Sequence, residues 1–210
     1  IIIFMIIFAF SRYFLPYKGA SNGKAIAIPK GIVTLFGVLA VISFLGEGGM
    51  MDWSGVFLTE AKGVDLSLAG VGYAVFSAAM LIGRLIGDKV VQKLGEQRVV
   101  IFGGIVASIG YIISIVFDNF FMMQFGFILL GFGAANIVPV VFTLLGRQKE
   151  MPINSAVTAV TSMGYLGVMF GPALLGFIAH GIGIVTVFCI LAGLFILQAI
   201  VSSYVFKVLN

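Results

Sequence analysis

The chain has 210 residues, of which 61% are hydrophobic and 10% are charged, and its formal net charge is +4. Soluble domains carry roughly 25% charged residues, so this composition excludes a globule in water and indicates that lipid covers most of the surface. The basic residues are spread over several loops, and the absence of a clustered basic face argues against a nucleic-acid partner.

The chain opens with two short units that precede the main apolar region. Residues 1–10 are all apolar. Residues 1–11 are therefore predicted to be the last part of a transmembrane helix whose beginning is missing. Residues 12–30 are polar, with Gly, Ser, Asn, Pro and basic side chains, and this composition predicts a loop. We therefore expect the chain to be a fragment of a longer protein.

Six apolar segments follow, and each is long enough to cross a hydrocarbon core of about 30 Å as an α-helix. They are residues 31–50, 66–87, 99–117, 120–146, 153–179 and 182–206. Long unbroken apolar runs differ from the alternating pattern of membrane β-strands. The expected fold is an all-α integral membrane protein with a six-helix bundle over residues 31–207 and a short tail at 208–210.

The loops between these segments must alternate between the two sides of the membrane. Of the twelve Lys and Arg residues, Lys62 alone lies on the side that holds the loop between residues 50 and 66. The other eleven lie on the opposite side of the membrane in this topology. Lys and Arg accumulate in cytoplasmic loops, so the opposite side, with the loop at residues 12–30 and the C-terminus, is predicted to be cytoplasmic. The basic residues there would contact anionic lipid headgroups.

The second predicted helix ends in a glycine-rich, charged stretch, GRLIGDK at residues 83–89. Together with Gly95, this stretch resembles the loop signature of the major facilitator superfamily (MFS) in its degenerate second copy, between helices eight and nine. The spacing from Asp88 to Gly95 is longer than in the strict signature, and Glu96 stands where a basic residue is usual. The resemblance implies a conformational latch made by Gly83, Arg84, Asp88 and Gly95, with Asp88 meeting the start of the fifth predicted helix. The alternative is that Arg84 and Asp88, which are spaced i,i+4, only anchor the helix end at the headgroups.

The stretch EGGMMDWS at residues 47–54 carries two carboxylates beside the first predicted helix. It resembles a segment of bacterial inner-membrane facilitators of the fucose-permease-like branch (the YbjJ type). Glu47 is predicted near the outer membrane edge, where Gly48 and Gly49 would loosen the helix end. A partly desolvated carboxylate can carry a proton, so Glu47 and Asp52 are candidates for substrate or proton handling. The alternative is a solvated outer loop with an acidic rim.

Polar residues also form stripes on apolar helices. The candidates for a substrate cavity are Tyr73 in the second helix, Asn136 in the fourth, and Thr161 and Tyr165 in the fifth. Polar stripes in a membrane should face protein or water, so they line either a cavity or a hydrogen-bonded helix contact. Pro139 follows Asn136 closely, and a bent helix there would direct backbone groups toward a cavity.

The resemblance implies the C-terminal half of a twelve-helix MFS transporter in a bacterial inner membrane, whose partner is a missing N-terminal six-helix half. The expected function is proton-coupled symport of a small polar solute, for example a sugar, by alternating access. Three alternatives remain open: proton-driven efflux of hydrophobic compounds, a non-transporting membrane interaction protein, and a six-helix homodimer. No enzyme signature, cofactor motif or metal-ligand cluster occurs in the sequence.

Overall fold

The computed structural model describes residues 27–209 of the chain. The predicted helix end at residues 1–11, most of the predicted loop at residues 12–30 and the last residue of the tail lie outside the described residues. The described part contains six helical segments that are long and apolar enough to cross a membrane. The predicted class, an all-α membrane protein with six transmembrane helices, is therefore confirmed.

The spans are built from helices that follow one another with short connections. The first is α2 (Ile32–Val56) with the π-helical turn η2 (Phe57–Ala61), and the second is η3 (Leu66–Leu68) with α3 (Val71–Leu85). The short helix α4 (Gly87–Leu94) leads to the third span, α5 (Glu96–Val116). The fourth is α6 (Phe120–Ala134), α7 (Ile137–Leu144) and η4 (Leu145–Arg147), and the last two are α8 (Ile153–Ile182) and α9 (Ile184–Leu209).

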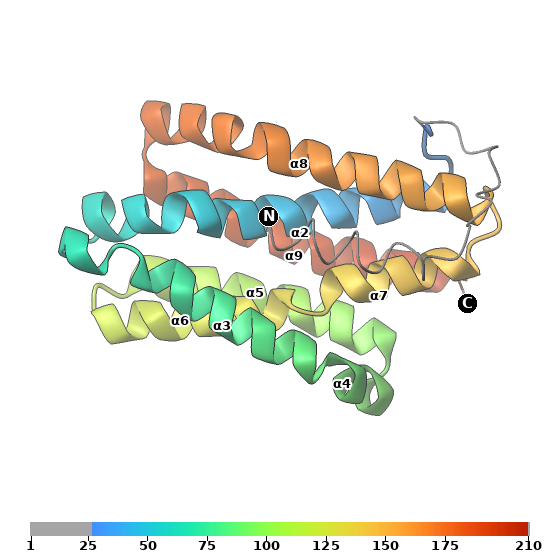
Figure 1. The fold of residues 1–210 in the computed structure, drawn as a ribbon, viewed down its shortest axis with the longest axis horizontal. Helices are drawn as coiled ribbons and strands as arrows, with labels where there is room; N and C mark the ends of the chain where they lie inside the picture. Colours follow the sequence, from blue (N-terminus) through green and yellow to red (C-terminus); the bar gives the residue numbers. More distant parts are fainter. Residues whose placement is uncertain (1–26, 210) are drawn as a thin grey trace, which may run out of the picture.

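Two groups of helices make up the bundle (Figure 1). α2 packs against α8 and α9, while α6 packs against α5 and α3. α5 also packs against α9, and this contact joins the two groups. α8 is the least buried of the six spans, because α2 is its principal neighbour.

The first span is longer than the sequence predicts. It runs as a 30-residue span from Ile32 to Ala61, so Glu47 lies near its middle and not at the outer membrane edge. The prediction failed because Gly48 and Gly49 do not end the helix. A Cβ on Gly49 would lie 2.7 Å from Leu191, so this glycine is a contact point with α9 and not a helix terminator.

Glycines on α5 and α6 bring these two helices into backbone contact. A Cβ on Gly110 would lie 2.5 Å from the carbonyl oxygen of Gly126, and a Cβ on Gly133 would lie 2.6 Å from that of Gly103. Small residues at such spacing let helix backbones approach closely in a membrane, where packing replaces the hydrophobic effect as the driving force. This close contact fixes the position of the fourth span.

The fourth span is interrupted, as the sequence predicts from Asn136 and Pro139. α6 ends at Ala134 and α7 begins at Ile137. Proline has no N–H, so Pro139 cannot donate the helical hydrogen bond that the carbonyl of Ala135 would otherwise accept. An unpaired carbonyl inside a membrane is costly, and it needs another donor.

Candidate functional site

An open cleft lies between α2 and α3, with one side closed by α8. Its volume is about 380 Å³. Its walls are Phe44, Glu47, Gly48, Met51, Tyr73, Phe76, Ser77, Met80, Leu81, Arg84 and Val168. The cleft combines an apolar wall with one carboxylate, one guanidinium and two hydroxyls. Three residues singled out from the sequence, Glu47, Tyr73 and Arg84, therefore face one space.

Glu47 and Arg84 form an ion pair across this cleft. Nη2 of Arg84 lies 3.3 Å from one carboxylate oxygen of Glu47 and 3.4 Å from the other. The Glu47 side chain is 20% exposed and that of Arg84 is 46% exposed. Charge-assisted N–H···O bonds are usually about 2.7–2.9 Å long, so the contact is loose.

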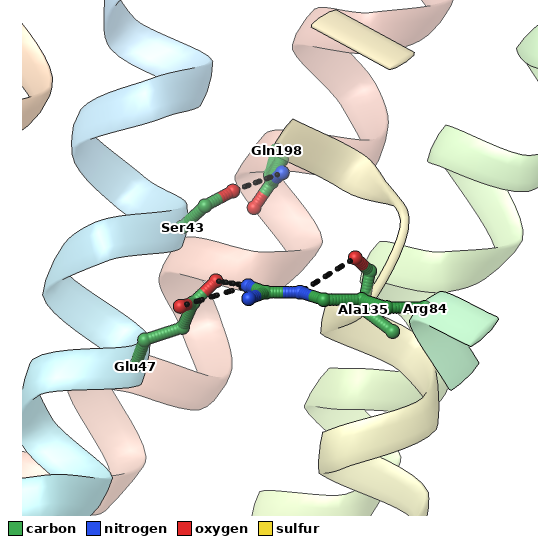
Figure 2. A network of polar contacts seen from close by, with 5 residues as sticks. All are labelled: Ser43, Glu47, Arg84, Ala135 and Gln198. Carbon is green, nitrogen blue, oxygen red and sulfur yellow. Dashed lines mark hydrogen bonds and ion pairs between the residues drawn. The ribbon is translucent and has the colours of Figure 1, made fainter. Parts of the chain in front are cut away.

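The other side of the guanidinium contacts the interruption in the fourth span (Figure 2). Nε of Arg84 donates to the carbonyl of Ala135 over 3.4 Å. This is the carbonyl that Pro139 leaves without a helical donor. In the opposite direction, Nδ2 of Asn136 donates a hydrogen bond to the carbonyl of Gly83 over 3.1 Å. Two hydrogen bonds thus join the end of α3 to the α6–α7 break.

Glycines of the predicted latch motif make room for this junction. A Cβ on Gly83 would lie 2.7 Å from the Cβ of Ala135, and a side chain on Gly87 would overlap Asn136. The Gly-rich helix end therefore permits close packing of α3 on the break.

A buried polar pair lies next to the ion pair (Figure 2). Ser43 and Gln198 are both 0% exposed, and Nε2 of Gln198 donates to Oγ of Ser43 over 3.0 Å. Oε1 of Gln198 is buried and has no partner among the described residues. Ser43 precedes Glu47 by one helical turn. The hydrogen bond between Gln198 and Ser43 was not predicted from the sequence. The feature that could have indicated it is a single amide side chain inside an apolar helix.

α2 is fixed below the carboxylate by a phenol from α5. The hydroxyl of Tyr111 donates to the carbonyl of Gly46 over 3.0 Å, and the Tyr111 side chain is fully buried. This contact of Tyr111 was not predicted from the sequence. Its bond holds the backbone beside Glu47 against the rigid α5–α6 pair.

The remaining cavity candidates are distributed around the cleft. The ring of Tyr165 stacks on Phe44 at a centroid distance of 6.2 Å, so Tyr165 borders the cleft behind one of its walls. Thr161 lies one turn earlier on α8 and is half-buried, outside the cleft wall. Asp52 is exposed on α2 and follows Met51, the last lining residue of that helix.

The latch candidates beyond Arg84 lie at the basic end of the bundle. Asp88 is exposed in the first turn of α4, and α3 ends before it, so Arg84 and Asp88 do not share one continuous helix. Gly95 ends α4 with φ +84°, a conformation that favours glycine. Glu96, the atypical acid of the motif, pairs with Arg147 at 2.8 Å and connects α5 to the end of the fourth span.

Six apolar spans, an interrupted helix and a charged cleft between helices define a polytopic membrane protein. Residues 33–209 match the Major Facilitator Superfamily, and the chain belongs to this superfamily. The predicted resemblance is confirmed at the level of the superfamily, while the fucose-permease-like branch stays a prediction.

The chain is similar to several bacterial membrane proteins. It is 47% identical to an uncharacterized MFS-type transporter of Yersinia pestis. The match extends over 159 residues, which are 76% of this chain and 41% of that protein. It is 30% identical over 150 residues to the membrane protein MosC of Rhizobium meliloti, covering 71% and 37%. The chain spans about two fifths of the length of these curated relatives.

Solved structures show the same fold at low identity. The POT family transporter PepTSo superposes with a TM-score of 0.70 and 16% identity, over 85% of this chain and 38% of that one. The arrangement is consistent with one half of an MFS bundle. Family membership and the relatives' names support a role in membrane transport.

Proposed function

We propose that this chain is the C-terminal half of a secondary active transporter, which moves a small polar solute, such as a sugar, together with a proton. The N-terminal six-helix half would close the open side of the cleft, and substrate would bind between the halves. Rocking of one half against the other would expose the site alternately to the two sides. The basic end of the bundle would face the cytoplasm.

The observation that carries this proposal is the Glu47–Arg84 ion pair at the open cleft. Ionisable residues inside membrane spans are costly and usually serve ion or substrate pathways. Glu47 can alternate between a carboxylate paired with Arg84 and a neutral acid, and the cleft gives it access to solvent. We propose Glu47 as the proton carrier.

Hydrogen-bonding groups in and near the cleft support a polar solute. Tyr73 and Ser77 lie on the cleft face of α3 and present hydroxyls. We propose that Tyr165 and Thr161 of α8 extend this polar surface when the second half is present. We also propose that Asp52, which lies inside the first span and follows the lining residue Met51, handles substrate or protons on the outer side of Glu47. Asn136 then serves the site indirectly, by holding α3 against the helix break.

We further propose that Asp88 and Gly95 belong to the latch implied by the family signature. Asp88 is exposed at the edge of the bundle and available to another helix. In this structure Gly83 and Arg84 connect α3 to the fourth span. A movement of α3 would therefore reach both the cleft and the latch.

Efflux of hydrophobic compounds is the second candidate, and one observation favours it. An apolar groove of about 300 Å³ runs between α2 and α8 beside the cleft. Its lining is Val41, Leu45, Met163, Leu166, Gly167, Phe170, Gly171 and Leu174. Adaptable Met and Phe side chains suit promiscuous apolar ligands.

The test uses the native gene product that contains this chain, reconstituted in sealed vesicles. Sugars and related polar solutes are added without a preset gradient, and the internal pH is recorded. We expect a solute-dependent pH change that Glu47→Gln abolishes. The matched control is Glu60→Gln, at an exposed carboxylate outside the cleft.

Each outcome bears on one of the two candidates. A pH change that persists in Glu47→Gln would remove Glu47 as the proton carrier. No pH change with any polar solute, together with proton movement on adding lipophilic cations or dyes, would favour efflux over uptake of polar solutes.

A further inference from the structure

The charge balance of the cleft restricts the kind of solute that it can hold. Arginine stays protonated at every physiological pH, so Arg84 is a permanent cation. Among the described residues, Glu47 is the one carboxylate that forms an ion pair with it. When Glu47 takes up a proton, the guanidinium loses its counter-charge inside a membrane span, where an uncompensated charge is costly.

A neutral solute cannot replace that counter-charge, whereas an anionic solute can. We propose that the substrate is a small hydroxylated monocarboxylate, of the sugar-acid type, whose carboxylate binds Arg84 in place of Glu47. The inference rests on the proposed proton-coupled transport and specifies its substrate class. One proton on Glu47 and one carboxylate on Arg84 then keep the net charge of the site unchanged.

The geometry of Arg84 leaves room for a second carboxylate. A guanidinium has five N–H donors. Nε donates to Ala135, and Nη2 alone contacts both oxygens of Glu47, while Nη1 has no hydrogen-bond acceptor in residues 27–209. The bidentate contact that arginine usually makes with a carboxylate is therefore unfilled.

The ion pair is also the loosest of the three in the described part of the chain. Its shortest N···O distance is 3.3 Å, against 2.6 Å for Lys62–Asp118 and 2.8 Å for Arg147–Glu96. The two tight pairs lie at the ends of the bundle, where they connect spans. A longer, solvent-facing contact is easier to exchange for another anion.

The rest of the cleft wall specifies the remainder of the solute. Arg84 is its single basic residue, so a monoanion is balanced and a dianion such as a phosphate ester is not. Ser77 lies on the same face of α3, two turns before Arg84, and the hydroxyl of Tyr73 lies one turn further. A carboxylate at one end and hydroxyls along the body match this row of groups.

Proton binding and anion binding are linked through the same guanidinium. The charged and titratable groups around Glu47 are Arg84 and the phenol of Tyr73 on α3 and the phenol of Tyr111 on α5. α9 contributes the neutral Gln198 and α8 the apolar Val168. Arginine stays cationic and tyrosine stays neutral at physiological pH, so among these groups Glu47 is the one that can change charge. Protonation of Glu47 in acid breaks its ion pair with Arg84, and the free guanidinium then binds the anionic solute more readily.

The experiment compares matched solutes on the native gene product that contains this chain. Glucuronate and glucose share a ring and differ in a carboxylate, as do galacturonate and galactose. We expect binding of the acid and none of the sugar, with a higher affinity at acid pH than at neutral pH, because protonation of Glu47 removes the carboxylate that competes for Arg84. Uptake of one proton with one monoanion is electroneutral, so an imposed membrane potential should not change its rate.

Two variants separate anion binding by Arg84 from general effects on the fold. Arg84→Met should weaken acid binding about tenfold or more, since the charge-assisted hydrogen bonds to the carboxylate are lost. Glu47→Gln should bind the acid with the same affinity at both pH values, because Arg84 is then permanently released. Arg98→Met, at an exposed arginine outside the cleft, is the control, and thermal stability and size-exclusion profiles verify folding of all variants.

The outcomes distinguish this inference from the proposed function. Proton-coupled, voltage-dependent uptake of the neutral sugars without the acids would overturn the carboxylate assignment and leave proton-coupled transport in place. Failure of every acid and every sugar in the panel to bind or to move protons would overturn both. Acid binding that survives Arg84→Met would also overturn the assignment of Arg84 as the anion site.

Discussion

The helix break and the cleft are connected by one carbonyl, and replacing Pro139 with alanine tests that connection. In the native chain Pro139 leaves the carbonyl of Ala135 without a helical donor, and Nε of Arg84 supplies one over 3.4 Å. In Pro139→Ala the new N–H can take over this role. We expect the variant to be more stable and less active.

The size of the effect follows from two opposing contributions. Proline in a helix interior costs about 3 kcal/mol relative to alanine, and less in the first turn of a helix, where Pro139 stands as the third residue of α7. The turn at Ala135 and Asn136 already absorbs part of this cost, and the charged hydrogen bond that is lost contributes about 1.5 kcal/mol or less at its long distance. A net gain of about 1–2 kcal/mol raises Tm by roughly 2–8 °C for a chain of this size.

The assay is thermal unfolding of the purified protein in detergent, together with the solute-dependent pH change in vesicles. Pro172→Ala in α8 is the matched control, because α8 continues through Pro172 and no cleft arginine donates to its freed carbonyl. We expect both variants to be stabilised and only Pro139→Ala to lose activity. A destabilised Pro139→Ala variant, or one with full activity, would refute the connection between the break and Arg84.

Three further predictions concern the scaffold. Gly110→Ala should destabilise the fold by about 1–3 kcal/mol, since its Cβ would lie 2.5 Å from a carbonyl oxygen of α6. Gly193→Ala in α9 meets nothing within 4 Å, so it should stabilise the fold by up to about 1 kcal/mol in the same melts. Equal Tm values for the two variants would contradict the close packing of α5 on α6. Asp118→Asn should cost up to about 1 kcal/mol, because Lys62 then keeps only a backbone carbonyl, and a loss that is unchanged in high salt would argue against an ion pair. The hydroxyl and the backbone N–H of Ser67 donate to Asp65 and hold the pKa of its carboxyl below the usual value. The stability that this cap contributes should therefore be present above about pH 4 and be lost as the pH falls further. Asp65→Asn should not show this loss in acid melts.

The number of spans and their type could be predicted from hydropathy, because each span must satisfy its backbone within the membrane. The break in the fourth span could be predicted as well, since Pro139 removes a donor wherever the chain packs. The length of the first span could not. Gly48 and Gly49 look like a helix end in isolation, and only the contact of Gly49 with Leu191 shows why they continue the helix.

Several residues of the candidate site could be predicted from the sequence, but which of them contact one another could not. Local spacing predicted that Arg84 would share a helix face with Asp88, yet α3 ends at Leu85 and the guanidinium contacts Glu47 on another helix. The two partners are separated by 37 positions in the chain, so their pairing depends on how α2 and α3 cross. Helical periodicity describes the faces of one helix and carries no information about such crossings.

The cleft unites several features that are unfavourable alone and compatible together. A proline interrupts a span, an arginine lies among apolar helices, and α3 ends in a glycine-rich stretch. The carbonyl freed by Pro139 accepts a hydrogen bond from Arg84, and the small Gly87 makes room for Asn136, which donates to the carbonyl of Gly83. Real sequences depart from local rules chiefly at functional sites, where a compensating gain exists. A pure packing role would be met by apolar residues at no such cost, so the retained charge pair is the strongest argument that this cleft binds something that crosses the membrane.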